Sequence, residues 1–339
     1  MRRIVTGSLV VLMLALVALP AALGRLAGRS TPAPPPVESE GPDSLPIKVY
    51  DPDTKQLNTY TLGEYLQGVV AAEMPHEFED EALKAQFVVA RTYAVRRMHQ
   101  FAGNGRGGCS LDLRADICAD PKTGQAFTSK AAYALEYGEA NANALWKRLS
   151  RLQAETEGQV VRYRGQLIDP LYHSVSGTRT EDAGNYFQEA LPYLKSVDDK
   201  WGADSPKLKA VSAVSPERLA EALEKAGKAV AVPALAGSVK AGKQPVEVQA
   251  RTEAGRVRTV KVLGVTLTGR EFREALGLPS NNFTVALRNG QIVIQTTGYG
   301  HGVGMSQYGA NGMAKAGMTY KEILLHYYTG VTLSAIYGE

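Results

Sequence analysis

The segment from Thr61 to Pro75 constrains the fold most, because it combines a helix start, one apolar face and an abrupt helix end. Thr61 followed three residues later by Glu64 has the spacing of a capping box, which predicts a helix start. Apolar residues then recur at helical spacing, at Leu62, Tyr65, Leu66, Val69 and Val70. Glu73 falls on the same face, and Pro75 ends the helix because the residue before a proline disfavours helical geometry. The segment therefore predicts a buried helix that ends on a carboxyl group.

Glu73 has two interpretations at this point. Burial disfavours the charged form of a carboxyl and raises its pKa, which makes a glutamate a usable acid near neutral pH. The alternative is a structural role, in which Glu73 caps a neighbouring segment or forms an ion pair with an arginine such as Arg91. Structural ion pairs outnumber catalytic acids, so the spacing alone favours the structural role.

The charge balance argues against nucleic-acid binding. Of the 38 basic residues, four lie in the first thirty positions, namely Arg2, Arg3, Arg25 and Arg29. The remainder of the chain holds 34 basic and 34 acidic residues. A neutral body lacks the basic surface that nucleic acid requires, so we expect no nucleic-acid partner.

The N-terminal segment predicts a membrane anchor. Residues 4–24 contain no charge and match the roughly 20 residues that cross a bilayer as a helix. A cleaved export signal is the alternative, although this apolar stretch is long for one and no clear cleavage site precedes Arg25. We therefore expect residues 1–29 to form a cytoplasmic tip and anchor, and the proline-rich residues 30–46 to form a linker. The body would then lie outside the cytoplasm, at the cell membrane.

The rest of the chain predicts an α+β fold of mixed helices and antiparallel hairpins. Asn289 and Gly290 between alternating strands are a strong hairpin signal. Helices are expected at residues 61–75, 80–100, 129–149, 215–227, 268–277 and 319–330, and strand pairs at 47–50 with 57–61, 159–163 with 166–168, 246–251 with 257–262, and 283–287 with 292–294. We assign residues 47–201 and 281–339 to one catalytic body and residues 202–280 to an inserted smaller lobe.

Two polar loops and two cysteines complete the set of candidate features. Hydroxyl, imidazole and charged side chains cluster directly after a strand at residues 172–182, and glycine alternates with other residues at 298–304. Cys109 and Cys118 are the only cysteines, and in an exported body a disulfide is the first interpretation, ahead of free thiols and a metal site. A metal site that used these thiols with His99 would make the protein a metalloenzyme.

Several of these segments together resemble the stage II sporulation protein D family of peptidoglycan lytic transglycosylases. The matching stretches run in order along the chain: YLQGVVAAEMP at 65–75, EALKAQ at 81–86, ARTY at 90–93, ADIC at 115–118, QAF at 125–127, YHSVSG at 172–177, FREALGL at 272–278 and GHGVGMSQYGA at 300–310. The resemblance covers the chain from about residue 47 to its C-terminus and includes the anchor. The resemblance favours the catalytic role of Glu73 over the structural role.

The resemblance implies an enzyme that cuts the β-1,4 bond between N-acetylmuramic acid and N-acetylglucosamine and leaves a 1,6-anhydro end. The C6 hydroxyl of the sugar attacks, so one glutamate, Glu73, serves as acid and then as base. Tyr172 and Ser176 are implied to position the sugar. Further candidates for contacts to the glycan are His173, Ser174, Gly177, His301, Ser306 and Gln307.

The resemblance also bears on cofactors and partners. Some family members carry a His-Cys-Cys zinc site, but here Asp112 and Gly124 stand where two of its ligands are expected, which favours a Cys109–Cys118 disulfide and no cofactor. The implied substrate is the peptidoglycan glycan strand, and the implied partner during engulfment is a cell-wall amidase, stage II sporulation protein P. The alternative function is a non-catalytic glycan-binding scaffold or activator of such an amidase.

Overall fold

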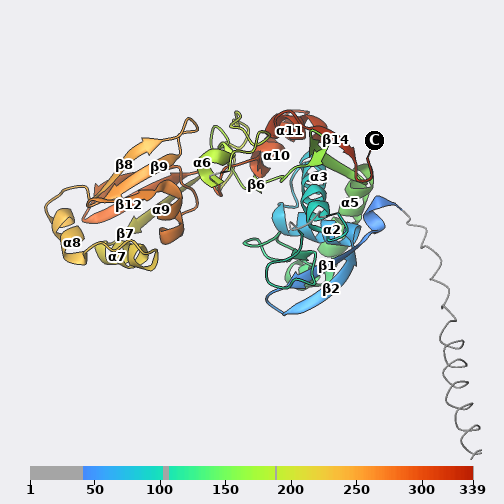
Figure 1. Cartoon of the computed structure of the whole chain (residues 1–339), viewed down its shortest axis with the longest axis horizontal. Coiled ribbons are helices and arrows are strands. Elements are labelled where there is room, and N and C mark those ends of the chain that lie inside the picture. Colours follow the sequence, from blue (N-terminus) through green and yellow to red (C-terminus); the bar gives the residue numbers. More distant parts are fainter. Residues whose placement is uncertain (1–40, 102–106, 188, 339) are drawn as a thin grey trace, which may run out of the picture. The chain divides into compact units, whose positions relative to one another are not determined.

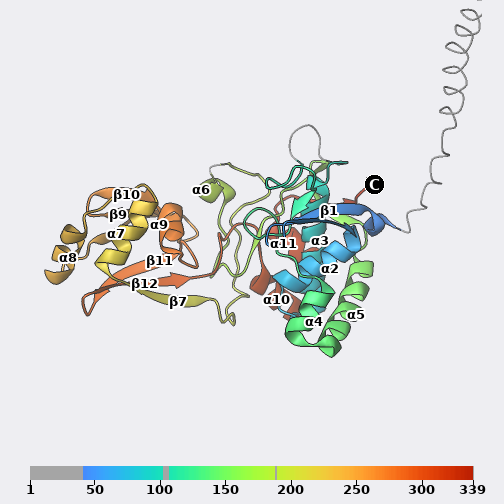
Figure 2. The same ribbon diagram turned by 90° about the horizontal axis from the view of Figure 1, so that it is seen from below.

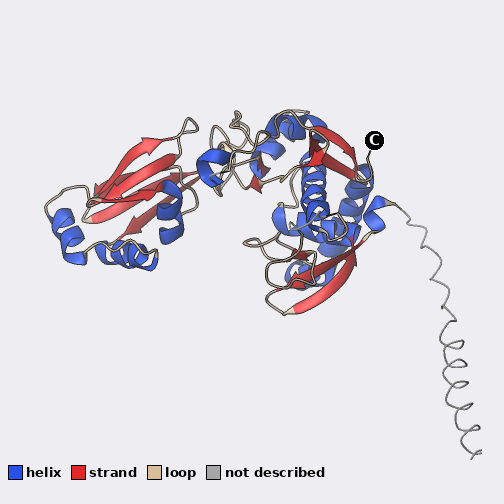
Figure 3. Ribbon diagram, viewed as in Figure 1, coloured by secondary structure: helices blue, strands red, loops and turns tan. Residues whose placement is uncertain are grey.

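A computed structural model describes residues 41–101, 107–187 and 189–338 (Figure 1). Helices and strands are mixed along this part of the chain without regular alternation, and Figure 3 shows both types throughout it. The predicted α+β class is therefore confirmed. Within the described residues, no helix combines the length and the apolar character needed to cross a bilayer. The predicted membrane segment at residues 4–24 and most of the predicted linker lie outside the described residues.

The helix that ends on Glu73 forms as predicted. Helix α2 spans Leu62–Glu73, and at its start the Thr61 side chain and Glu64 form a complete capping box. Met74 leaves the helix in extended geometry, directly before Pro75. The preceding strands β1 (Pro46–Asp51) and β2 (Gln56–Thr61) pair antiparallel, and β3 (Ile117–Cys118) joins β1 in parallel.

Helix α3 (Asp80–Arg97) packs against α2 and forms the centre of the larger hydrophobic cluster. Thirteen consecutive or near-consecutive residues of α3 are buried, since other elements cover the helix on several sides. Arg91 on α3 is fully buried and donates from Nε and Nη2 to the two carboxylate oxygens of Asp43, at 2.7 and 2.6 Å. Asp43 lies in the short 3-10 helix η1 (Pro42–Ser44).

The helix predicted at residues 129–149 is two helices. α4 (Lys130–Tyr137) and α5 (Glu139–Glu155) meet at Gly138, whose φ of +89° suits glycine and ends the first helix. Figure 2 shows the two helices side by side, and they contact each other. The hairpin of β4 (Gln159–Tyr163) and β5 (Gln166–Leu167) is confirmed, and β14 (Thr332–Ala335) adds to its free edge.

A second hydrophobic cluster draws on residues between Val214 and Ile294. Its elements are β7 (Lys209–Val214), α7 (Pro216–Lys225), α8 (Val232–Lys240), β8 (Val246–Arg251), β9 (Val257–Val262), β10 (Val265–Thr268), α9 (Gly269–Leu276), β11 (Phe283–Arg288) and β12 (Gln291–Thr297). β12 lies between β11 and β7 in one sheet, so the hairpin that we assigned to the catalytic body pairs with a strand of the proposed lobe. The boundaries of that lobe stay a prediction.

The remaining elements position the candidate site. Two very short strands, β6 (Tyr172–His173) and β13 (Met305–Ser306), pair in parallel and join the two polar loops of the sequence analysis. Helix α10 (Gln307–Lys315) follows β13 directly and contacts α3, and α11 (Tyr320–Tyr327) is the predicted last helix. The sequence patterns do not predict helices α6 (Ala183–Phe187), α8 and α10.

Candidate active site

Glu73 is the last residue of α2, and its carboxyl is held by two donors from other parts of the chain. Oε1 accepts a hydrogen bond from the main-chain N–H of Ala126 at 3.0 Å and another from the Tyr172 hydroxyl at 3.0 Å. Gln307, the first residue of α10, donates from Nε2 to the main-chain oxygen of Glu73 at 3.2 Å. Segments around residues 73, 126, 172 and 307 therefore meet at this carboxyl group.

Burial raises the pKa of the Glu73 carboxyl above its ordinary value of 4.5. The hydrogen bonds that Oε1 accepts from Ala126 and Tyr172, together with the nearby amide of Gln307, act in the opposite direction, but they do not outweigh burial. Arg91 forms its ion pair with Asp43, so the ion pair between Glu73 and Arg91 that the sequence left open is wrong. The side chain is only partly buried, and Glu73 thus combines a raised pKa with access to solvent.

Behind Tyr172, a chain of hydrogen bonds runs into the core. Gln125 Nε2 donates to the Tyr172 hydroxyl at 3.2 Å, and the Tyr65 hydroxyl donates to Gln125 Oε1 at 3.1 Å. Gln125 and Tyr65 are both buried, and the Tyr65 ring stacks on Phe127 at 5.7 Å between ring centroids. From the sequence, Tyr65 is expected only as a core residue, and Gln125 is not predicted as a site residue. The one available signal was that both lie in stretches that match the family.

The last residue of β6, His173, and the loop that follows it carry four of the candidate residues. The His173 imidazole and the Ser176 hydroxyl are buried and hydrogen-bonded, with 2.7 Å between Nε2 and Oγ, and His173 Nδ1 lies 3.2 Å from the carbonyl oxygen of Val303. Ser174 is partly exposed, and its carbonyl accepts from the N–H of Tyr308. Gly177 is buried with a φ of +113°. These contacts tie the loop to the segment around residues 299–308.

That second segment holds the other candidates. His301 Nδ1 accepts from the N–H of Val303 at 3.0 Å, so the ring is neutral with its proton on Nε2. Burial, together with the cations of Arg256 and Arg273, lowers the pKa of His301 to about 3. Ser306 is fully buried, and its Oγ accepts from the N–H of Gly309 as the N-cap of α10. Of the candidate residues, Tyr172 and Gln307 are the two that form hydrogen bonds with Glu73.

A buried arginine directly before β9 contacts both loops. Arg256 Nη2 donates to the carbonyl oxygen of Ser176 at 3.2 Å, and Nη1 donates to Asn281 Oδ1 at 3.0 Å. Burial lowers the pKa of Arg256 to about 10, so the guanidinium stays charged at neutral pH. A Cβ at Gly302, which has a φ of +84°, would overlap this guanidinium. The close approach requires glycine at this position of the loop.

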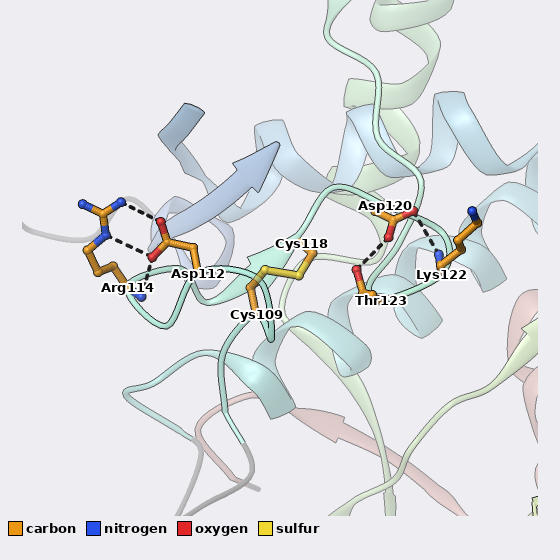
Figure 4. Close-up of a disulfide and its surroundings, with 7 residues drawn as sticks. All are labelled: Cys109, Asp112, Arg114, Cys118, Asp120, Lys122 and Thr123. Carbon is orange, nitrogen blue, oxygen red and sulfur yellow. Dashed lines mark hydrogen bonds and ion pairs between the residues drawn. A yellow bond between two sulfur atoms is a disulfide. The ribbon is translucent and has the colours of Figure 1, made fainter. Parts of the chain in front are cut away.

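Cys109 and Cys118 form the predicted disulfide (Figure 4). Asp112, at one expected zinc-ligand position, forms an ion pair with Arg114, and a Cβ at Gly124 would overlap the carbonyl of Cys118. The residues at these positions therefore do not fit the His-Cys-Cys zinc site of some family members. The metalloenzyme alternative requires Cys109, Cys118 and His99 as metal ligands. Both thiols are oxidised in the disulfide, and His99 Nδ1 pairs with Asp116 at 2.7 Å.

Comparisons with known proteins bear on the identity of the chain. A family model described as stage II sporulation protein matches residues 50–163. The chain is similar to stage II sporulation protein D of Bacillus amyloliquefaciens, with 39% identity over 307 residues, which are 90% of this chain and 83% of that protein. The same protein of Bacillus subtilis (strain 168) is 38% identical over 304 residues, 89% of this chain and 83% of the relative. The amidase enhancer of Bacillus subtilis is 27% identical over 316 residues, which cover 80% of this chain and 40% of that protein. The chain therefore belongs to the stage II sporulation protein D family, whose role is in sporulation.

Proposed function

We propose that this protein is a peptidoglycan lytic transglycosylase that cleaves the bond between N-acetylmuramic acid and N-acetylglucosamine, with Glu73 as acid and base. One observation carries the proposal. The Glu73 carboxyl has a pKa raised by burial, yet it is partly exposed and fixed in place by hydrogen bonds from Ala126 and Tyr172. A general acid needs this combination of retained proton, fixed position and access.

The hydrogen bonds also indicate which oxygen carries the proton. Oε1 already accepts two hydrogen bonds, from the N–H of Ala126 and the hydroxyl of Tyr172. A proton on Oε1 would compete with these donors, so the acid form of Glu73 carries its proton on Oε2. In the proposed reaction Oε2 is the atom that faces the glycosidic oxygen.

The proposed reaction needs one carboxyl group. Glu73 transfers its proton to the glycosidic oxygen while the bond from that oxygen to C1 of the muramic acid breaks. The C6 hydroxyl oxygen of the same sugar forms a new bond to C1, and its proton passes to the Glu73 carboxylate, which restores the acid. Glycosidases that use water need a second carboxylate. The main influences on the pKa of Glu73 are burial and hydrogen bonds rather than a neighbouring carboxylate, which suits the one-carboxyl route.

The other candidate residues divide by exposure. Tyr172, Ser174 and His301 are partly exposed, and we propose that they contact the glycan. His173, Ser176, Gly177, Ser306 and Gln307 are buried, and we propose that they hold the two loops around the sugar. The neutral His301 would offer its Nε2–H as a hydrogen-bond donor to a sugar hydroxyl or acetamide oxygen.

We further propose that residues 4–24 anchor the protein in the cell membrane and that the enzyme remodels peptidoglycan outside the cytoplasm during engulfment. A cell-wall amidase similar to stage II sporulation protein P is the proposed partner. The relative named amidase enhancer supports a link of this kind.

The test is mass analysis of the products from purified glycan strands. Wild type should release fragments with 1,6-anhydro ends, and Glu73→Gln should reduce their release by about 100-fold to 10,000-fold, the usual contribution of a general acid. Glu77→Gln is the matched control, because Glu77 is exposed and only four residues away. Release of anhydro fragments by Glu73→Gln at the wild-type rate would refute the role of Glu73.

The second candidate function is activation of an amidase without glycan cleavage, which the name of the amidase enhancer relative favours. In that case wild type would release no anhydro fragments, but it would speed release of stem peptides by an added amidase. Glu73→Gln would stimulate the amidase as well as wild type does.

A further inference from the structure

We propose that Tyr65 and Gln125 are positioning residues that force the hydroxyl of Tyr172 to donate its proton to Glu73 Oε1. The proposal rests on the proposed function, since it assigns these two residues a role at the same carboxyl. Neither residue reaches the surface: the exposed fraction is 0% for Tyr65 and 1% for Gln125. They act on Glu73 only through Tyr172.

The direction of each hydrogen bond follows from the donors available. Gln125 lies between two tyrosine hydroxyls, with Oε1 at 3.1 Å from Tyr65 and Nε2 at 3.2 Å from Tyr172. An amide nitrogen can only donate, so the Tyr172 oxygen accepts from Gln125. The single proton of the Tyr172 hydroxyl is then directed to Glu73 Oε1, 3.0 Å away. All three groups are satisfied in this arrangement.

The reversed amide would break the arrangement at two points. With Nε2 facing Tyr65, the Tyr65 proton would lose its acceptor inside the core. With Oε1 facing Tyr172, the Tyr172 proton would turn to Gln125 and leave Glu73 without that donor. Buried donors without partners are costly, so the Tyr65 hydroxyl selects the observed orientation of Gln125.

The selection matters most when Glu73 is protonated. A hydrogen bond from Tyr172 to the carboxylate is charge-assisted, whereas one to the neutral acid is weaker. Without the Tyr65 hydroxyl, Gln125 Oε1 has no partner, and in the acid form it can reorient and accept from Tyr172. Loss of the Tyr65 hydroxyl therefore favours the acid form and raises the pKa of Glu73.

The phenols near Glu73 keep their protons in the pH range where the Glu73 carboxyl titrates. Burial raises the pKa values of Tyr65, Tyr93 and Tyr172, so these phenols on α2, α3 and β6 are neutral throughout. The Arg97 guanidinium stacks on the ring of Tyr93 and forms an ion pair with Asp169 at 3.5 Å. A change in the titration of Glu73 in the variants can thus be assigned to the hydrogen-bond chain.

The experiment is an NMR titration of the Glu73 carboxyl carbon in wild type, Tyr65→Phe, Tyr172→Phe and the double variant. Tyr65→Phe should raise the titration midpoint by about 0.5 to 1 pH unit, the equivalent of one modest hydrogen bond. Tyr65→Phe should not change the midpoint further when Tyr172 is already phenylalanine, because the hydrogen-bond chain acts through the Tyr172 hydroxyl. The alkaline limb of kcat/KM should move up with the midpoint.

Tyr320→Phe is the matched control. The Tyr320 hydroxyl also donates to a glutamine oxygen, Gln159 Oε1, at 3.0 Å, but it is not part of this chain. Its loss should leave the Glu73 midpoint unchanged. If Tyr65→Phe fails to fold, Gln125→Met replaces it, and its midpoint should also rise because Tyr172 loses the donor that polarises its hydroxyl.

The titration does not depend on activity, so it separates this proposal from the proposed function. An unchanged midpoint in Tyr65→Phe, or equal effects of Tyr65→Phe with and without the Tyr172 hydroxyl, would overturn the positioning role. A raised midpoint in a protein that releases no anhydro product would leave the hydrogen-bond chain intact and refute the transglycosylase instead.

Discussion

Gly302→Ala tests whether the second hydrophobic cluster holds the glycine-rich loop through Arg256. Two costs are expected. Gly302 has a φ of +84°, where an alanine costs about 1 to 2 kcal/mol of backbone strain. The new Cβ would also overlap the Arg256 guanidinium, which is fully buried and hydrogen-bonded to Ser176 and Asn281, so it cannot withdraw freely.

Overpacking of this kind costs about 1 to 3 kcal/mol, so Gly302→Ala should lower the free energy of unfolding by about 2 to 5 kcal/mol. Gly290→Ala is the matched control, because Gly290 has a φ of +72° and no atom within 4 Å of the added Cβ. It should cost about 1 to 2 kcal/mol from backbone strain alone. The assay is denaturant unfolding of both variants. Equal losses in the two variants would refute the contact between Arg256 and this loop.

Three further predictions concern stability. Glu73→Gln should become more stable relative to wild type as the pH rises from below 4.5 through the raised pKa of Glu73, because wild type must then bury a charge. Unfolding curves at acidic and neutral pH check this. A difference in the free energy of unfolding that stays the same at both pH values contradicts it. Replacing Cys109 and Cys118 by serine should lower the free energy of unfolding by about 2.5 kcal/mol, the value for a loop with a sequence separation of 9. A chelator should leave the stability of wild type unchanged. A loss of stability with chelator would indicate a bound metal instead. Asp43→Asn leaves Arg91 as a buried charge without its partner and should cost about 3 to 5 kcal/mol in the same assay, whereas a loss under 1 kcal/mol would contradict the buried ion pair.

The local parts of the site were predictable from the sequence. Thr61 and Glu64 define the start of α2, Pro75 defines its end, and the spacing of apolar residues places Glu73 at a buried helix end. These features depend on neighbours within one or two turns, so a single sequence contains them. The break at Gly138 was less visible, since one glycine in an alanine-rich stretch can be tolerated within a helix.

The long-range parts of the site were not predictable in the same way. The parallel pairing of Tyr172 with Met305 joins residues that are far apart in the chain, and two-residue strands have no recognisable pattern. Helix α10 was missed because Gly309 and Gly312 lower its helix propensity, although close packing against Asp199 and Trp201 requires them. Gln125 was missed because its role depends on contacts to Tyr65 and Tyr172 from separate elements.

The central claim is that the C6 hydroxyl of the sugar, and not water, displaces the glycosidic oxygen while Glu73 moves the proton. The most direct measurement is digestion of purified glycan strands in water labelled with heavy oxygen, followed by mass analysis of the new ends. The account predicts 1,6-anhydro ends that contain no heavy oxygen, and their loss in Glu73→Gln. Reducing ends that carry one heavy oxygen would contradict it, because they would show that water attacks and that a second group must activate it.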